Sequence, residues 1–149
     1  MLAKSLATIV IADDDSDDRM MIEDAFKESR LANPRVYVED GEQLMQYLRG
    51  EDRAAAAAQG EAWPALILLD LNMPRLDGRG VLAQLKADPA LRRIPVVVLT
   101  TSKLEEDILR TYDLGVSSFI TKPVSFDALV NVVNALNAFW IKLAQLPGH

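Results

Sequence analysis

The sequence contains no cysteine. This absence excludes disulfides, thiolate zinc sites and cysteine nucleophiles, and it fits a reducing compartment. Long hydrophobic runs are missing too. The apolar stretch near the start of the chain, from Leu6 to Ala12, ends at Asp13 and is too short to span a bilayer. An acidic cluster follows this stretch where a signal peptide would need its cleavage region. We therefore expect a cytoplasmic protein without a membrane segment.

Positive charge is also scarce. The 149 residues include 16 Lys and Arg against 22 Asp and Glu, which gives a formal net charge of −6. Because a nucleic-acid surface needs clustered cations, we expect no direct nucleic-acid partner. Half of the residues are hydrophobic, which excludes disorder as a general description. The length predicts a single domain over residues 1–149, since domains commonly run to about 100 to 150 residues.

Short apolar runs alternate along the chain with stretches of helical period. Three runs are continuous and apolar, as in central strands buried on both faces: residues 8–11, 65–69 and 95–99. Two weaker runs are typical of strands near a sheet edge: residues 36–38 and 118–120. Apolar residues at helical spacing predict a helix after each strand: Met20 to Phe26, Leu44 to Leu48, Val81 to Leu85, Ile108 to Leu114, and Phe126 onward.

This order of strand and helix, repeated five times, predicts the fold class. Parallel strands need crossover connections, which are usually helical, so we expect an α/β fold in which a five-stranded parallel sheet carries helices on both faces. In such folds ligands bind outside the carboxyl ends of the strands. Residues 50–64 include five consecutive alanines and exceed the usual connection of about 2 to 6 residues. We interpret them as a surface insert.

Polar residues gather at the predicted carboxyl ends of the strands. Asp13 to Asp15 follow the first strand, Asp70 ends the third, Thr100 and Thr101 follow the fourth, and Lys122 follows the fifth. Two carboxylates about 4 Å apart repel by about 4 kcal/mol at an effective dielectric of 20, so the acids need a cation. Oxygen donors without His or Cys select a hard ion, and they suit Mg²⁺ bound together with a phosphoryl group. The ammonium of Lys122 is suited to pair with that group.

Each of these residues also has an ordinary structural explanation. The acids from Asp15 to Asp18 stand where a helix should begin, so they are suited to cap it and to complement its dipole. A threonine of the pair Thr100 and Thr101 is suited to cap the next helix, and Lys122 alone would be a surface charge. Asp70 is the hardest to explain in this way, because an acid that ends five apolar residues is costly to desolvate without a partner.

Five short strings stand in order at these strand ends: IADDD at 11–15, LLDLNMP at 68–74, DG at 77–78, LTTS at 99–102 and TKP at 121–123. In this order they resemble the receiver domain of two-component response regulators, over almost the whole chain. The resemblance implies a flavodoxin-like (βα)5 receiver fold with strand order 2-1-3-4-5. The insert at 50–64, the string at 88–95 and Phe139-Trp140 resemble, more narrowly, stand-alone regulators that partner phytochrome-type histidine kinases.

The resemblance implies a role for each site residue. Asp70 would be the nucleophile that takes a phosphoryl group from a phosphohistidine on a sensor histidine kinase. It implies that Mg²⁺ is held by these groups: the carboxylates of Asp14 and Asp70, the backbone carbonyl of Asn72, and Asp13 through a bound water. Lys122 and Thr100 would supply the ammonium and hydroxyl, which suits a reaction that depends on positioning and on neutralising charge.

The same resemblance implies a switch. Thr100 would swing toward the phosphoryl group and Phe119 would turn inward, which shifts the population between two states; the alternative for Phe119 is an ordinary core residue. The peptide bond Lys122-Pro123 is expected to be cis, a form that proline makes accessible. Asn72 and Ser102 stand at positions that influence how fast the adduct hydrolyses.

The last predicted helix, at about 125–146, is unusually long. From Phe126 to Leu146 it would reach about 30 Å, whereas a five-residue strand covers roughly 17 Å. Its apolar surface is too broad for one sheet face, so we expect a homodimer through this helix. The residues expected at that interface are Leu136, Phe139, Trp140 and Leu143. The alternative is that the aromatic pair folds back on its own domain.

These features favour a stand-alone response regulator, a phosphorylation-driven switch that acts on a further protein partner and is not an enzyme in the ordinary sense. A rival from another class is a Mg²⁺-dependent phosphatase resembling the haloacid dehalogenase group. That group needs an acid two residues after its nucleophile, where this chain has Asn72. A third reading is a receiver-like scaffold that is not phosphorylated, which the retained acceptor-site residues disfavour.

Overall fold

The computed structural model describes residues 8–49, 66–70, 78–100, 118–121, 123 and 125–138. The strands in these ranges are β1 (Ile9–Ala12), β2 (Arg35–Val38), β3 (Leu66–Leu69), β4 (Val96–Thr100) and β5 (Ser118–Thr121). The helices in the same ranges are α1 (Ser16–Glu28), α2 (Gly41–Arg49), α4 (Gly78–Ala87) and α6 (Phe126–Leu136). Among these helices, none is long and apolar enough to cross a membrane.

The strands form one parallel sheet in the order β2-β1-β3-β4-β5. This confirms the predicted α/β class and strand order, and it places the two weak apolar runs, β2 and β5, at the sheet edges. The sheet is built outward from β1: β2 lies on one side of it, and β3, β4 and β5 follow on the other side. The carboxyl ends of β1 and β3 therefore lie next to each other at the place where such folds bind ligands.

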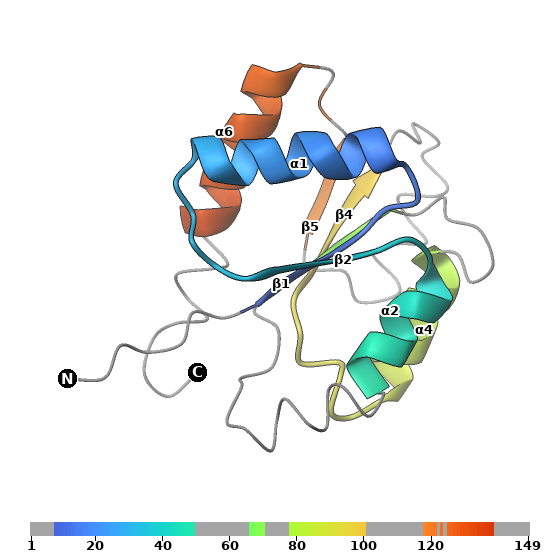
Figure 1. Ribbon diagram of the computed structural model, residues 1–149. Helices are drawn as coiled ribbons and strands as arrows, with labels where there is room; N and C mark the ends of the chain where they lie inside the picture. The colour runs from blue at the N-terminus through green and yellow to red at the C-terminus, as the bar shows by residue number, and fades with distance from the viewer. Residues whose placement is uncertain are drawn as a thin grey trace.

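Helices cover both faces of the sheet. Figure 1 shows α1 and α6 on one face, and α2 with α4 on the other. Side chains of β1 alternate between the two layers, so Val10 packs with α2 and α4 while Ile11 packs with α1 and α6. Both are buried. A strand buried on both faces has no polar side, which explains its continuous apolar sequence.

One expectation about apolar residues needs correction, and one confirmed helix has a further feature. Leu136, which we placed on a dimer surface, is only 1% exposed and packs in the core layer of α1 and α6. It is therefore a core residue of the single chain. Met20 and Met21 help to mark the first helix in the sequence, yet they are 65% and 36% exposed, because α1 turns other apolar residues toward the sheet.

Several expected elements lie outside the described residues. They are the insert at 50–64, the helix expected around Ile108 to Leu114, and the part of the last helix beyond residue 138. The described part of that last helix begins at Phe126 after the cap Ser125, whose side chain accepts a hydrogen bond from the backbone N–H of Ala128.

A charged cluster ties α1 to β2. The Arg35 guanidinium pairs with both carboxylate oxygens of Glu23, with Nη2 at 2.8 Å from Oε2. The Tyr37 hydroxyl donates to the same carboxylate at 2.6 Å. Arg35 also lies 5.2 Å from the centroid of the Phe26 ring and donates to the carbonyl of Leu31. The hydrogen bond from Arg35 lowers the pKa of Glu23, while burial raises the pKa of Tyr37.

Candidate functional site

Two buried carboxylates stand at the carboxyl ends of neighbouring strands. Asp13 follows β1 and Asp70 follows β3, and the register places Ala12 beside Leu69. The backbone N–H of Asp70 donates to the carbonyl of Ala12 at 3.0 Å, so the ladder continues to the two acids. Asp13 is 1% exposed and Asp70 is 7% exposed. Strand pairing therefore forces these two acids together at the sheet edge.

Asp14 completes the cluster from the solvent side. One carboxylate oxygen from each of Asp13, Asp14 and Asp70 lies within 4.8 Å of the other two. Asp14 is exposed while the other two are buried, so the cluster lies at the boundary between protein and solvent. The grouping expected from the sequence, in which acids from separate strands converge, is present in the structure.

Asp15 is distinct from this cluster. Its side chain caps α1 by accepting hydrogen bonds from the backbone N–H groups of Asp17, at 2.8 Å, and Asp18, at 3.3 Å. The helix-capping explanation thus holds for Asp15. Its own N–H donates to Asp13 Oδ1 at 2.9 Å, which fixes the direction of that carboxylate.

Arg19 is a positioning residue that the sequence reasoning missed. Its Nη1 donates to the backbone carbonyl of Asp13 at 2.6 Å, and its Nη2 lies 3.4 Å from Oε1 of Glu39. The guanidinium therefore joins the acidic loop to the residue that follows β2. The one available signal was its place as the first cation after the acidic run of Asp13 to Asp18.

The donor set fits a divalent cation. Three carboxylates so close together repel one another, and burial of two of them strengthens the repulsion. Their oxygens are the hard ligands that Mg²⁺ and Mn²⁺ accept, and an exposed side leaves positions open for water or a phosphoryl oxygen. Asp13, Asp14 and Asp70 are therefore the residues suited to hold such an ion.

The other predicted site residues fall at or beyond the limits of the description. Thr100 ends β4 and Phe119 lies in β5, where the register pairs it with Val98, but their side chains are outside the described part. The remaining ones are outside it entirely: Asn72, Ser102, Lys122 with its bond to Pro123, Phe139, Trp140 and Leu143. Their roles stay predictions. Thr100 nonetheless stands at the same carboxyl edge of the sheet as Asp70.

Divalent metal is expected to stabilise the fold through these acids. Because the ion binds the folded arrangement, saturating Mg²⁺ at about 100 times its dissociation constant adds about 2.7 kcal/mol. This corresponds to a rise of about 5–10 °C in the midpoint of thermal unfolding, measured against an EDTA sample. Asp70→Asn is expected to raise the midpoint in EDTA, because it removes repulsion, and to reduce the response to Mg²⁺. Asp15→Asn is the matched control, and equal Mg²⁺ responses in both variants would contradict the assignment.

Comparison with known proteins identifies the family. The family model for the response regulator receiver domain matches residues 9–134. Response regulator Rcp1 of Synechocystis is 36% identical over 139 residues, which cover 93% of this chain and 92% of Rcp1. A probable methanogenesis regulatory protein, FilR2 of Methanothrix harundinacea, is 35% identical and covers 94% of this chain and 87% of its own.

Solved structures give the same answer. The phosphorylated cyanobacterial phytochrome response regulator RcpA is 42% identical and superposes with a TM-score of 0.83, covering 96% of this chain and 99% of its own. The Mn²⁺-bound form of Rcp1 superposes with a TM-score of 0.79 at 35% identity, covering 95% of this chain and 99% of its own. The match over the whole sheet, the convergence of its three acids and the likeness to these regulators together show that this chain belongs to the response regulator receiver domain family.

Proposed function

We propose that this chain is a stand-alone signalling switch that accepts a phosphoryl group on Asp70 from a histidine kinase, in a reaction that requires Mg²⁺. The observation that carries the proposal is the convergence of one carboxylate oxygen each from Asp13, Asp14 and Asp70 within 4.8 Å. Asp70 follows β3, whose residues are all buried, just as Asp13 follows the buried strand β1. The backbone of Asp70 is therefore held firmly, which suits a nucleophile.

The transfer itself is a displacement at phosphorus. An oxygen of Asp70 forms the new P–O bond while the P–N bond to the kinase histidine breaks, and the electron pair of that bond stays on the imidazole nitrogen. Asp14, Asp70, the carbonyl of Asn72 and, through a water, Asp13 would hold Mg²⁺, which when bound neutralises charge on the phosphoryl oxygens. Lys122 and Thr100 would pair with the remaining oxygens. All of these residues would act by positioning the phosphoryl group and by neutralising its charge.

Phosphorylation would change the conformation of residues in β4 and β5. Thr100 at the end of β4 would move toward the added phosphate, which carries about −1.5 to −2 charges. Phe119 in the neighbouring strand β5 would then turn inward, and the changed surface would bind a downstream protein. Asn72 and Ser102 would set the lifetime of the adduct, and a cis Lys122-Pro123 bond would aim the ammonium at the site.

A phytochrome-type kinase is the phosphoryl donor that we propose. Rcp1 of Synechocystis and RcpA both align with nearly the whole of this chain, and RcpA is a cyanobacterial phytochrome response regulator. We further propose a cytoplasmic protein that pairs as a homodimer through Phe139, Trp140 and Leu143. The phosphatase alternative lacks support, because its leaving-group acid would have to be Asn72.

The test is phosphorylation of the purified chain. Incubation with acetyl phosphate and Mg²⁺ is expected to give one acid-stable, base-labile adduct, detected by intact mass, and EDTA is expected to prevent it. Labelled phosphoryl groups on a phytochrome-type kinase should transfer to the chain under the same conditions. No adduct from either donor would refute the proposal. Rapid turnover of many phosphomonoesters would instead favour the phosphatase.

A further inference from the structure

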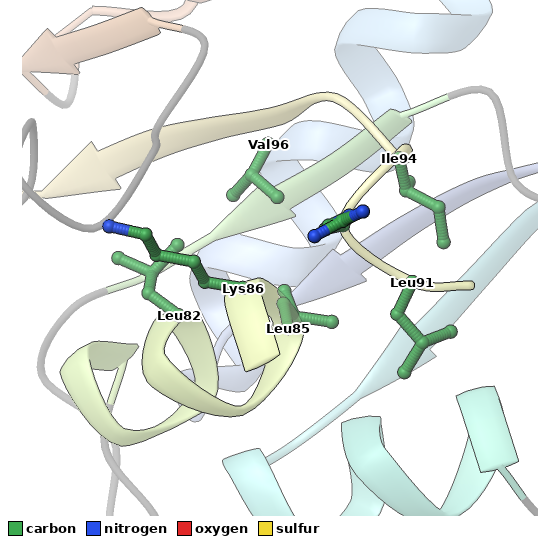
Figure 2. Close-up of a pocket in the computed structure, with 7 residues that line it drawn as sticks. Leu82, Leu85, Lys86, Leu91, Ile94 and Val96 are labelled. Carbon is green, nitrogen blue, oxygen red and sulfur yellow. The ribbon is translucent and has the colours of Figure 1, made fainter. Parts of the chain in front are cut away.

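A small apolar cavity lies at the opposite end of the sheet from the acidic site. Its apolar lining comes from α4, the turn after it and the start of β4: Leu82, Leu85, Leu91, Ile94 and Val96. Figure 2 shows the leucines of α4 on one side and Leu91 with Ile94 of the turn on the other. Because Val96 begins β4, the cavity is separated from the carboxyl edge by the length of a five-residue strand, roughly 16 Å.

The size and chemistry of the cavity suit an apolar group. Its volume is about 90 Å³. Leu85, Leu91 and Ile94 are only 3%, 2% and 6% exposed, so they offer hydrocarbon and no hydrogen-bond partners for water. Lys86 and Arg92 also border the cavity, so its apolar floor opens to solvent beside two cations, and a ligand group that covers this floor is best apolar. The space fits one branched aliphatic or phenyl side chain.

The rim of the cavity is positively charged in a chain that is acidic as a whole. Lys86 and Arg92 border it, Arg93 follows in sequence, and all three are exposed. The segment formed by α4, its turn and β4 contains four cations and one acid, Asp88, whose Oδ2 lies 3.3 Å from Nε of Arg49. Within the described part of the chain, neither Arg92 nor Arg93 forms an ion pair. Their charge is directed at solvent.

We propose that this cavity and its basic rim dock an acidic segment of a partner protein that inserts one apolar side chain. A buried apolar anchor surrounded by complementary charges is the usual arrangement of a binding hot spot. A nucleic acid would meet the cations but has no branched apolar group for the cavity. The cavity lies at the start of β4, whereas Asp70 follows the end of β3, so Asp70 itself does not line the proposed docking surface.

The probe is an acetylated and amidated peptide of sequence Glu-Glu-Leu-Glu-Glu, titrated into the ¹⁵N-labelled full chain. The expected result is a saturable shift of the amide signals of Leu85, Leu91 and Ile94, which weakens as salt is added. A peptide with Ala in place of Leu is expected to bind about tenfold more weakly, because it fills less of the cavity.

Charge reversal at the rim provides the decisive variant. The double variant Arg92→Glu, Arg93→Glu is expected to bind the Leu peptide about tenfold more weakly than the original chain does. Its thermal unfolding midpoint should be unchanged, because both side chains are exposed. Lys27→Glu with Arg30→Glu changes the net charge equally on another surface and should bind as the original chain does. Asp70→Asn should also bind normally, which separates this proposal from the proposed phosphoacceptor function.

Three outcomes would overturn the proposal. The first is the absence of shifts at Leu85, Leu91 and Ile94 with peptide at about 5 mM, a concentration that detects even weak docking. The second is equal binding by the rim variant and its control. The third is the appearance of the same shifts when the chain alone is concentrated, which would make a second copy the occupant.

Discussion

Replacing Asp70 by Asn is expected to abolish the phosphoryl adduct formed from acetyl phosphate or from a kinase. The amide has nearly the same shape as the carboxylate, but it is not a nucleophile at phosphorus, so the loss should be at least about 10³-fold. Asp14→Asn keeps the acceptor and removes one proposed metal ligand. It should therefore leave adduct formation possible but raise the Mg²⁺ concentration required by at least about tenfold. Both effects are measured by intact mass across a Mg²⁺ titration.

Asp15→Asn is the matched control for this series. It removes a charge from the same acidic run, yet Asp15 caps α1 and its carboxylate lies outside the cluster of three. Because Asn is as good a helix cap as Asp, the fold should be intact and the adduct should form normally. Persistence of the adduct in Asp70→Asn would place the acceptor elsewhere. Equal loss in the Asp15 variant would show that the acidic loop acts through the start of α1.

The sheet could be predicted from the sequence because burial leaves a direct trace. Both faces of β1 are covered, so Val10 and Ile11 are each apolar although they point into different layers. In β2, at the sheet edge, Arg35 and Tyr37 are only partly buried, and the apolar run there is correspondingly weak. The order of the strands cannot be predicted in this way, because an apolar run does not indicate which other strand pairs with it. That order followed from the resemblance to receiver domains.

The acidic cluster was predictable for a related reason. Parallel strands bring their carboxyl ends to one edge, so acids that follow two central strands converge when those strands pair. The pairing of Ala12 with Leu69 does this for Asp13 and Asp70. Residue type alone does not divide the run of acids into ligands and caps, but the expected helix start assigned Asp15 to capping, and the resemblance to receiver domains assigned Asp13 and Asp14 to the metal. The divide falls after Asp14, because the side chain of Asp15 turns to the helix start.

The sequence did not predict which apolar residues of a helix face the sheet and which face solvent. The apolar residues of the first helix outnumber those that its buried face can hold, so Met20 is exposed while Ile22 and Phe26 are buried. Leu136 was misplaced for the same reason in α6, where it packs in the core. Contacts between elements were also invisible: Arg35 meets Glu23 twelve residues earlier, a spacing that no helix or strand period produces.

That contact is expected to carry a large part of the stability. Arg35→Met is expected to lower the free energy of unfolding by about 2–4 kcal/mol, because it removes the paired donors to both oxygens of Glu23 and a cation from the face of Phe26. The carboxylate then keeps only the Tyr37 hydroxyl and the more distant ammonium of Lys27. For a chain of this size the thermal midpoint should fall by about 6–12 °C. Urea or thermal unfolding at pH 7 measures the loss. A midpoint within about 1 °C of the original would contradict the assigned role.

Lys27→Met is the matched control, since Lys27 meets the same carboxylate from one helical turn away. Its ammonium is 4.0 Å from Glu23 Oε2 and its side chain is 67% exposed, so its loss should cost at most about 0.5 kcal/mol. The pH dependence supplies a second readout. Arg35 lowers the pKa of Glu23 from its ordinary value of 4.5, so the pair contributes fully above that pH and its contribution declines as pH falls through the lowered value. The stability gap between the original chain and Arg35→Met should therefore narrow in acid, whereas a gap caused by lost packing alone would remain constant.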